Sequence, residues 1–493
     1  MKIGIDVGGT HTDGVLIENT RILKSVKVKT QDPIIDGIAH VLSKFNADAS
    51  HIVIGTTKAT NAILEGKNLA KVGLIRLSGK HGACYPPGSF WPEHLLQAID
   101  LEWESVSGGY ECDGREISPL KDAECRSAIY QLLQKGVQSF AIAGIFSPLI
   151  PNQEKMVANL IQDIAGKDFP VTLSSSIGGM GLIERENGAI FNAALIPVMA
   201  RDFALLEKLK DDLNIRCPMY LSQNNGSLLH IEDAIAHPIL TIASGPTNSH
   251  IGACRLSHLS DAIIVDVGGT STDIGLVLNG YPIRSLNQTS LGGVRLNFHA
   301  PDLISLPVGG GSHVAQNLQV GPKSFGRDLK SHACIFGGND LTLTDLACVA
   351  GHLHIERADP SNVRIKKEVA TKVLLDLKLK LNQSIQKMRG KHHHLPVIFV
   401  GGAAPIFGET LPSNYAVANA YGAALSEMAV TLDRMVCMKD RENTLSQLEA
   451  EAKRQALEKG AKGEIRKVNL QIIPYNYFKD PLARVILTVS GAI

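Results

Sequence analysis

Residues 3–17 read IGIDVGGTHTDGVLI and residues 263–277 read IIVDVGGTSTDIGLV, and this imperfect repeat decides the fold. In each copy an apolar run ends at Asp-Val-Gly-Gly and another begins after Thr-Asp, which predicts a β-hairpin with glycines at its turn. Those glycines allow positive φ and remove the Cβ atom that would keep a ligand away from the main chain. Two hairpins of one design, far apart in the sequence, predict two similar halves that share one binding device.

The bulk composition fits a chain with more than one folded unit. Its 493 residues are too many for one ordinary core, so we expect at least two domains. Lys and Arg number 49 against 48 Asp and Glu, which argues against nucleic acid or an anionic membrane as the main partner. The eight cysteines form no C-x-x-C pair, no signal sequence precedes the first strand, and no apolar run approaches the roughly 20 residues of a spanning helix. We therefore expect a cytoplasmic protein.

Short β-branched runs alternate with longer helical patterns, which is typical of an α/β protein. The expected elements between the hairpins and after them are a connector helix at 187–206, strands at 219–228 and 238–247, a buried strand at 397–400 and a helix from about 414 to 428. A charged helix at 443–459 and strands at 468–473 and 483–489 would form a small α+β appendage. The expected domains are 1–190, 191–430 and 431–493.

The two hairpins suit a phosphate chain and a hydrated cation. Neither hairpin contains a lysine, so backbone N–H groups and a cation must meet the negative charge. The residues expected to bind phosphate through turn amides or hydroxyl groups are Gly8, Gly9, Thr10, Thr12, Gly268, Gly269, Thr270, Ser271 and Thr272. The carboxylates expected to face Mg²⁺ are Asp6, Asp13, Asp266 and Asp273, with Asp6 and Asp266 as the metal residues. The alternative is a pair of surface hairpins with Asp as a turn former.

The order of these motifs resembles the actin, Hsp70 and sugar-kinase superfamily. Its phosphate motifs match Asp6–Asp13 and Asp266–Asp273, its adenosine motif matches Gly401-Gly402, and its connecting helices match 187–206 and 413–428. Between the motifs the chain looks most like the A-type chain of the hydantoinase/oxoprolinase family. The matching stretches are GTTKATNAILE at 55–65, SQNNG at 222–226, SGP at 244–246, GGGS at 309–312 and LTD at 343–345.

The resemblance implies two ribonuclease-H-like, actin-like ATPase domains that face a nucleotide cleft. It also implies a hydrolase that uses ATP and Mg²⁺ to phosphorylate the carbonyl oxygen of a cyclic amide or imide, such as a hydantoin or 5-oxoproline, before water opens the ring. The implied substrate contacts are Thr56, Thr57, Asn61, Asn224 and Asn225, whose hydroxyl and amide groups match ring donors and acceptors. Asp13 or Asp273 could serve as general base, and His313 is a weaker choice. The implied partners are a B-type subunit and further copies of the chain.

Two glycine loops complete the expected site. Gly309, Gly310 and Gly311 would bind phosphate or substrate, and the alternative is a hinge. Gly401 and Gly402 would admit adenine or ribose, and the alternative is an ordinary strand-to-helix turn.

The chain departs from the family pattern at three places where the reacting molecule would be held. Ile54 replaces a histidine, SGPTNS replaces Ser-Gly-Pro-Ala-Ala-Gly at 244–249, and Leu306-Pro307-Val308 precedes the triple glycine. A small-molecule kinase and a nucleotide-dependent switch or assembly protein are therefore rival functions. We interpret the histidines at 392–394 as a solvated loop, and Cys334 and Cys348 as core residues.

Overall fold

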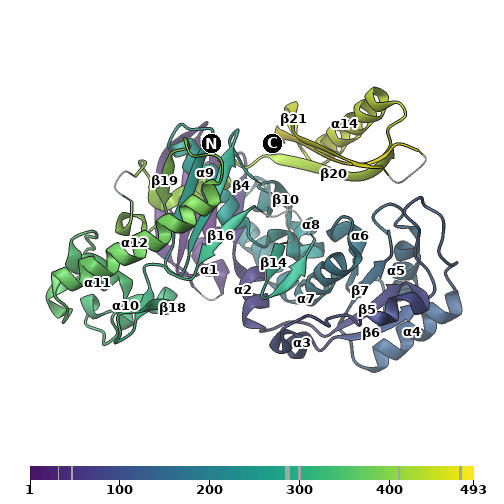
Figure 1. Cartoon of the computed structure of the whole chain (residues 1–493), viewed down its shortest axis with the longest axis horizontal. Helices are drawn as coiled ribbons and strands as arrows, with labels where there is room; N and C mark the ends of the chain where they lie inside the picture. The colour runs from purple at the N-terminus through teal and green to yellow at the C-terminus, as the bar shows by residue number, and fades with distance from the viewer. Residues whose placement is uncertain (32, 46–47, 284–288, 298–300, 409–410, 477–479) are drawn as a thin grey trace.

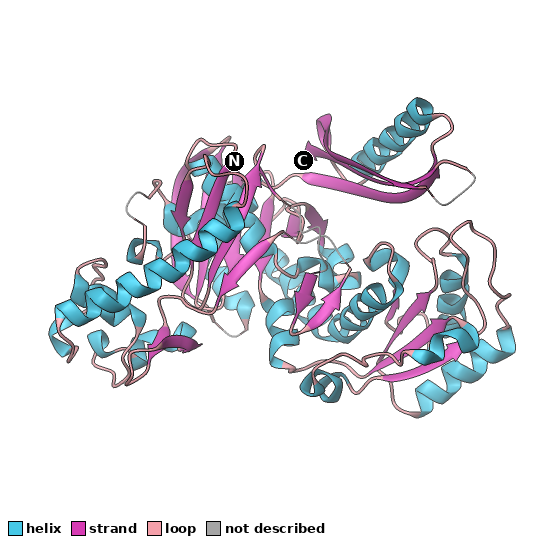
Figure 2. Ribbon diagram, in the orientation of Figure 1, coloured by secondary structure: helices cyan, strands magenta, loops and turns pink. Residues whose placement is uncertain are grey.

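The computed structural model describes residues 1–31, 33–45, 48–283, 289–297, 301–408, 411–476 and 480–493. Two sheets built on the repeated hairpins form its framework (Figures 1 and 2). The first sheet has the order β10-β9-β4-β1-β2-β3, and its strands are β1 (Lys2–Val7), β2 (His11–Glu18), β3 (Arg21–Lys29), β4 (Ile52–Thr56), β9 (Met219–Ser222) and β10 (Leu228–His230). In both sheets the first hairpin strand also has a parallel neighbour on its other side, namely β4 for β1 and β19 for β11.

The second sheet has the order β13-β12-β11-β19, with a fifth strand, β16, also paired to β12. Its strands are β11 (Ala262–Val267), β12 (Thr272–Leu278), β13 (Tyr281–Pro282), β16 (Leu303–Leu306) and β19 (Val397–Val400). The expected strand at 397–400 is confirmed. Strand β11 is buried along its whole length, and its side chains pack against helices α11 (Leu343–Ala350) and α12 (Lys367–Arg389). A short hairpin, β17 (Ser312–Val314) and β18 (Val320–Ser324), lies beside this sheet with α10 (Leu329–His332).

Two helices cross between the sheets. Helix α9 (Ser244–Leu256) contacts β4 and β9 of the first sheet and β11 and β12 of the second, and it packs along α13 (Ala418–Leu425). The crossing depends on glycine, because a Cβ atom on Gly252 would lie 2.0 Å from the carbonyl oxygen of Ala418. A Cβ atom on Gly422 would lie 1.8 Å from the carbonyl oxygen of Asn248. The two backbones therefore touch directly.

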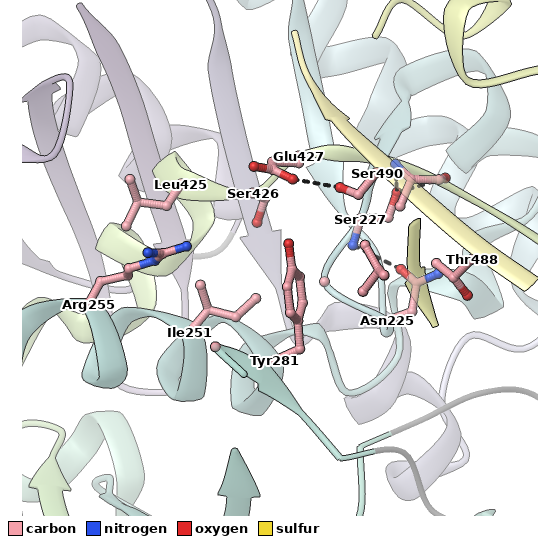
Figure 3. A pocket seen from close by; sticks show the side chains of 14 residues that line it. Asn225, Ser227, Ile251, Arg255, Tyr281, Leu425, Ser426, Glu427, Thr488 and Ser490 are labelled. Carbon is pink, nitrogen blue, oxygen red and sulfur yellow. Dashed lines mark hydrogen bonds between the residues drawn. The ribbon is translucent and has the colours of Figure 1, made fainter. Parts of the chain in front are cut away.

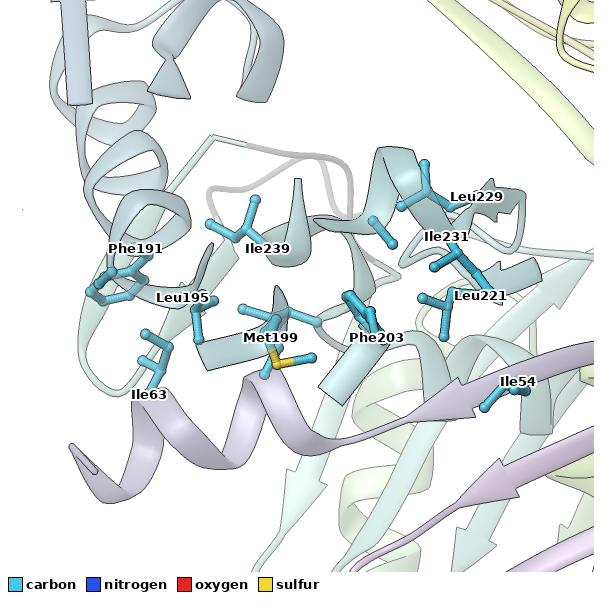
Figure 4. Close-up of a cluster of buried hydrophobic side chains, with 14 of the residues drawn as sticks. Ile54, Ile63, Phe191, Leu195, Met199, Phe203, Leu221, Leu229, Ile231 and Ile239 are labelled. Atoms are coloured by element: carbon cyan, nitrogen blue, oxygen red, sulfur yellow. The ribbon is translucent and has the colours of Figure 1, made fainter. Parts of the chain in front are cut away.

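The expected connector at 187–206 was wrong in its role. Those residues belong to α7 (Leu182–Asp212), which packs against the first half beside α2 (Lys58–Glu65), as the side chains of Phe191, Leu195 and Met199 show in Figure 4. Within the described part of the chain, α7 alone is long and apolar enough to span a membrane by length and composition. Most of its apolar stretch is buried inside the protein.

The expected boundary at residue 190 does not separate the two sheets. The boundary falls inside α7. Strands β9 and β10 follow residue 190 in the sequence, yet they belong to the first sheet. A hairpin from the second half, β14 (Thr289–Leu291) and β15 (Val294–Leu296), also packs on α2 and α7. The expected strand at 238–247 was wrong too, since the chain there forms a 3-10 helix at Pro238–Thr241 and then starts α9. Contacts between segments far apart in the sequence decide where the halves divide and which residues form strands. A local sequence pattern does not reveal those contacts.

The first half carries a second sheet that the sequence did not predict. Its four strands are parallel, in the order β6-β5-β7-β8, and it appears at the lower right of Figure 1. Its strands and the other helices of this half are β5 (Val72–Leu77), β6 (Glu102–Val106), β7 (Ser139–Gly144), β8 (Val171–Leu173), α1 (Ile34–Ser43), α3 (Glu93–Ile99), α4 (Asp122–Gln134), α5 (Asn152–Ala165), α6 (Ser174–Ile177) and α8 (Ile231–Ala236).

The C-terminal unit is a three-stranded antiparallel sheet with one helix. Its elements are β20 (Met428–Cys437), α14 (Arg441–Glu458), β21 (Lys462–Tyr475) and β22 (Leu482–Ala492), in the sheet order β20-β22-β21. The small α+β appendage is confirmed, with longer strands than expected. The helix expected to reach residue 428 ends at Leu425, and the strand β20 that follows it was missed.

Candidate functional site

The two repeated stretches form hairpins with the same register. Asp6 lies opposite Asp13 in the first hairpin, and Asp266 lies opposite Asp273 in the second. The turns close alike, because the amide of Gly8 donates to the carbonyl of His11 at 3.0 Å and that of Gly268 to Ser271 at 2.9 Å. One local sequence pattern therefore produces one geometry twice.

The tips of the two hairpins meet. A Cβ atom on Gly269 would lie 2.8 Å from Cγ2 of Thr10, so the second turn touches the first. The carboxylate of Asp266 is close enough to Asp6 to raise its pKa. The sequence predicted that the two glycine hairpins would face one another, and the structure has this arrangement.

Turn amides are available at both tips. The amides of Gly9 and Thr10, and those of Gly269 and Thr270, donate to no acceptor in the part of the chain that the structure describes. Such amides at a glycine turn form an anion-binding concavity.

Three of the expected hydroxyl donors are already engaged. Thr12 shares a hydrogen bond with Thr30 at 3.3 Å, and Thr272 donates to the carbonyl of Val308 at 2.7 Å. Both threonine side chains are buried. Ser271 donates to Asp273 at 3.4 Å. These three hydroxyl groups stabilise the hairpins in this conformation. The hydroxyl groups of Thr10 and Thr270 are the two that remain for the expected phosphate.

The four hairpin carboxylates fall into two kinds. Asp13 is paired with a cation, because Nζ of Lys27 on β3 lies 2.7 Å from both of its oxygens. Among the residues that the structure describes, Asp6 and Asp266 have no such partner. Burial and the neighbouring carboxylate of Asp13 raise the pKa of Asp6 to about 7. Burial and Asp273 raise the pKa of Asp266 to about 6.

This arrangement fits a hydrated divalent cation. Oδ1 of Asp6 is buried and has no hydrogen-bond partner among the described residues. Two buried carboxylates without a counter-charge would be stabilised by a cation. No group of three or more His, Cys, Asp or Glu side chains in the described ranges could hold a metal alone. Mg²⁺ in particular needs only one or two carboxylates when it keeps its waters and also binds phosphate.

The triple-glycine loop supports the second hairpin in this conformation. The amides of Gly310 and Gly311 donate to the carbonyls of Gly268 and Gly269 at 3.0 and 2.7 Å, and that of Gly309 donates to Oγ of Ser312 at 2.9 Å. A Cβ atom on Gly309 would lie 2.6 Å from the amide nitrogen of Thr270. In this structure the three amides are used internally, and the glycines allow close packing of main chain. That these glycines bind phosphate or substrate stays a prediction, which would have to use other atoms of the loop.

The second glycine pair lies beside Asp266, at the end of β19. Gly401 has a φ of +92°, and a Cβ atom on it would lie 2.3 Å from Oδ1 of Asp266. A Cβ atom on Gly402 would meet nothing within 4 Å. The first glycine therefore lets the strand pass the carboxylate, and the second leaves the open approach expected of an adenosine motif.

The expected substrate residues do not form one cluster. Thr56 pairs with Val7 across β4 and β1, and the amide of Thr57 donates to the carbonyl of Val7 at 3.3 Å, so both lie against the first hairpin. Asn61 is exposed on α2.

The other two expected substrate residues lie in the turn after β9. Asn224 is buried, with its Nδ2 atom unpaired among the described residues. Asn225 accepts a hydrogen bond from the amide of Ser227 and lines a separate small pocket beside Tyr281 and Glu427 (Figure 3). The structure therefore places Thr56 and Thr57 near the hairpins and Asn225 elsewhere.

Three polar side chains at the hairpins were missed by sequence reasoning. Lys27 comes from β3, Asn248 from α9 and Asn419 from α13, whose Nδ2 atom lies 3.4 Å from Oδ2 of Asp6. The only signal was the departure SGPTNS, which carries Asn248.

The surroundings of Cys334 and Cys348 agree with their interpretation as core residues. Burial raises the pKa of Cys348 to about 11 and that of Cys334 in the same direction, which disfavours a thiolate. His313, the weaker choice of general base, packs its ring edge-on against Phe325 with ring centroids 5.8 Å apart.

The chain matches two family models in succession. Residues 2–165 match the hydantoinase/oxoprolinase N-terminal region, and residues 185–389 match hydantoinase/oxoprolinase. Caprolactamase subunit alpha of Pseudomonas jessenii is 27% identical over 75% of this chain and 57% of its own length. Acetophenone carboxylase gamma subunit of Aromatoleum aromaticum is 24% identical over 76% and 56%, and 5-oxoprolinase of Saccharomyces cerevisiae is 26% identical over 72% and 32%. The chain thus spans less than two thirds of these relatives.

Two solved structures share the fold over the whole chain. The ATP-dependent caprolactamase from Pseudomonas jessenii matches with a TM-score of 0.76 and 21% identity, and nucleotide-free acetone carboxylase with 0.72 and 17%. Each match covers 100% of this chain and 88% of the other. The expected fold class, two actin-like ATPase domains with a small C-terminal unit, is confirmed.

Proposed function

We propose, from the premise that this chain belongs to the hydantoinase/oxoprolinase family, that it is an ATP-dependent hydrolase of cyclic amides or imides. The observation that carries the proposal is the meeting of two glycine hairpins. Their inner carboxylates, Asp6 and Asp266, form no ion pair with a cation in the described part of the chain. Relatives named caprolactamase and 5-oxoprolinase support a ring amide as substrate.

The chemistry explains why ATP would be spent. An amide carbonyl is a poor electrophile, and transfer of the γ-phosphoryl group to its oxygen converts that oxygen into a leaving group. Water then adds to the carbon, and the ring C–N bond breaks as the nitrogen takes up a proton. A second water hydrolyses the resulting acyl phosphate, so the products are the ring-opened amino acid, ADP and phosphate. In this chain the free amides at Gly9, Thr10, Gly269 and Thr270 would hold phosphate oxygens. Mg²⁺ near Asp6 would neutralise phosphate charge.

The surroundings of the outer carboxylates favour one general base. Lys27 holds both oxygens of Asp13, whereas Asp273 accepts hydrogen bonds from the hydroxyl groups of Ser271 and Ser305. Burial raises the pKa of both carboxyl groups, so we favour Asp273 over Asp13 because both oxygens of Asp13 are held by Lys27. Replacement of Asp273 by Asn would then reduce ring opening while leaving Mg²⁺-nucleotide binding in place.

The test is an ATPase screen of the purified chain against hydantoin, 5-oxoproline and ε-caprolactam, with and without Mg²⁺. We expect one ring to stimulate phosphate release only when Mg²⁺ is present, and Asp6→Ala and Asp266→Ala to abolish Mg²⁺-ATP binding in a folded protein. Phosphate retained on an alcohol product would instead indicate a kinase. A nucleotide-driven conformational change that no ring affects would indicate a switch or assembly protein.

A partner subunit is part of the proposal. Two relatives are named as subunits, and this chain spans little more than half of each. We propose that a B-type subunit completes the hydrolytic step, so the screen should be run with the chain alone and with a co-expressed B-type protein. ATP cleavage by the chain alone without ring opening would assign activation to this chain and hydrolysis to its partner.

A ketone carboxylase is the second candidate. The acetophenone carboxylase subunit matches 76% of this chain, and acetone carboxylase shares its fold. ATP cleavage that requires a ketone together with bicarbonate, and that no ring amide stimulates, would favour this candidate.

A further inference from the structure

We propose that Asn248 is a positioning residue of the cation site, whose side-chain amide binds the water shell of a divalent cation held between Asp6 and Asp266. The inference rests on the proposed nucleotide site and goes beyond it, because Asn248 lies on neither hairpin. The residue belongs to α9, the helix that crosses between the two sheets.

The first observation is the state of the amide itself. Asn248 is fully buried, yet neither Oδ1 nor Nδ2 has a hydrogen-bond partner among the described residues. A buried amide that bonds to nothing costs free energy, and native interiors contain few such groups. A side chain with both a donor and an acceptor unused is therefore suited to a ligand that offers both.

The second observation is where the amide lies. Nδ2 of Asn248 and Oδ1 of Asp6 lie 2.9 and 2.8 Å from the point that a Cβ atom on Gly55 would occupy. The absence of a side chain at Gly55 keeps that point clear. Oδ1 of Asp6 is also unpaired, so an unsatisfied carboxylate oxygen and an unsatisfied amide lie beside the same point.

The neighbouring groups from the crossing helices are neutral. Ser249, the next residue of α9, hydrogen-bonds to Asp266 and lowers its pKa against the effect of burial. Asn419 of α13 donates to Asp6 at 3.4 Å. Lys27, the cation nearest to the hairpins, is bound to Asp13. Neutral amides and hydroxyls leave the charge of the two inner carboxylates for an external cation.

A hydrated magnesium ion matches this set of groups. Mg²⁺ dehydrates reluctantly and keeps several water molecules. These waters would donate hydrogen bonds to Asp6, Asp266 and Oδ1 of Asn248. Nδ2 of Asn248 would donate to Asp6 or to a phosphate oxygen. Outer groups of this kind orient the inner ones and tune affinity for the metal.

The test measures binding rather than turnover. The Kd of Mg²⁺ is obtained from thermal shifts of the full chain in saturating ADP, and the Kd of ADP is measured in EDTA. For Asn248→Ala we expect the Kd of Mg²⁺ to rise about tenfold or more, with the Kd of metal-free ADP unchanged. The variant without ligand should be at least as stable as the wild type, because the unpaired amide is gone.

Two further variants keep the test decisive. Ser139→Ala is the matched control, since Ser139 is another buried and unpaired polar side chain but lies on β7, in the four-stranded sheet. It should leave the Kd of Mg²⁺ unchanged. Asn248→Asp keeps an oxygen at the site and should restore affinity for Mg²⁺ to the wild-type level or above. This variant also serves if the alanine protein does not fold.

A Kd of Mg²⁺ within twofold of the wild-type value in Asn248→Ala, or equal losses in Asn248→Ala and Ser139→Ala, would overturn the inference. The proposed function fails separately, when the wild type binds Mg²⁺-ADP but no ring amide stimulates ATP cleavage. Wild-type protein that binds no Mg²⁺-nucleotide at all would refute both.

Discussion

Replacement of Asp6 by asparagine should have opposite effects on stability with and without ligand. The side chain is buried, and its pKa is about 7 in the folded chain against 3.8 as the ordinary value. A raised pKa means that this carboxyl group contributes stability below pH 3.8 that is lost as the pH rises through 7. Asparagine has nearly the same shape and never ionises, so it escapes this loss.

The magnitude follows from the shift. About 3 pKa units at about 1.4 kcal/mol each give about 4 kcal/mol at pH 8, and the difference from the wild type shrinks to less than about 2 kcal/mol at pH 5. If the 493 residues unfold together, the unfolding entropy is about 1 kcal/mol per degree, so Asp6→Asn should raise Tm by about 4 °C at pH 8. In Mg²⁺-ADP at a hundred times Kd, the wild type should gain about 2.7 kcal/mol that the variant does not.

Differential scanning fluorimetry at pH 5 and pH 8, with and without Mg²⁺-ADP, measures all four values. A variant less stable than the wild type at pH 8 without ligand would refute the assignment of Asp6 as a buried carboxylate that is destabilising when ionised. A variant stabilised as much as the wild type by Mg²⁺-ADP would refute the assignment of Asp6 to the cation. Glu93→Gln, a change at an exposed carboxylate on α3, is the matched control and should change neither value.

Two substitutions and one labelling experiment test separate parts of the structure. Lys27→Met leaves the carboxylate of Asp13 without its cation and should lower the free energy of unfolding by about 2 kcal/mol. In thermal denaturation, the double variant Lys27→Met with Asp13→Asn should recover most of that lost stability. Gly252→Ala forces α9 and α13 apart and should cost about 3 kcal/mol and weaken nucleotide binding; an unchanged Tm would contradict the close crossing. A thiol reagent at pH 8 should label Cys84 quickly and Cys348 only on unfolding, as mass spectrometry of labelled peptides would show, since Cys84 is exposed and burial raises the pKa of Cys348 to about 11.

Local pattern was sufficient for the parts of the site that lie within one hairpin. The apolar runs, the glycine turn between them and the flanking aspartates predicted both hairpins, and the structure pairs Asp6 with Asp13 and Asp266 with Asp273. The short strand at 397–400 was predicted from its apolar run, although only Val400 of its four residues is fully buried. Turn chemistry and strand periodicity act over a few residues, so sequence alone reports them.

Only the tertiary structure decided which of these groups has a partner. The four hairpin aspartates look equivalent in the sequence, but Lys27 neutralises Asp13, while Asn419 and Asn248 reach the inner pair from helices far along the chain. The triple glycine was expected to bind a ligand, and its amides are used by the second hairpin.

The connector helix and the placement of β9 and β10 were likewise set by long-range packing. Periodicity tells which face of an element is apolar, and it does not tell which distant element will cover that face. The sequence by itself therefore determined the two hairpins and their chemistry. Their pairing, their charge state and the polar residues around them were decided when the chain brought distant segments together.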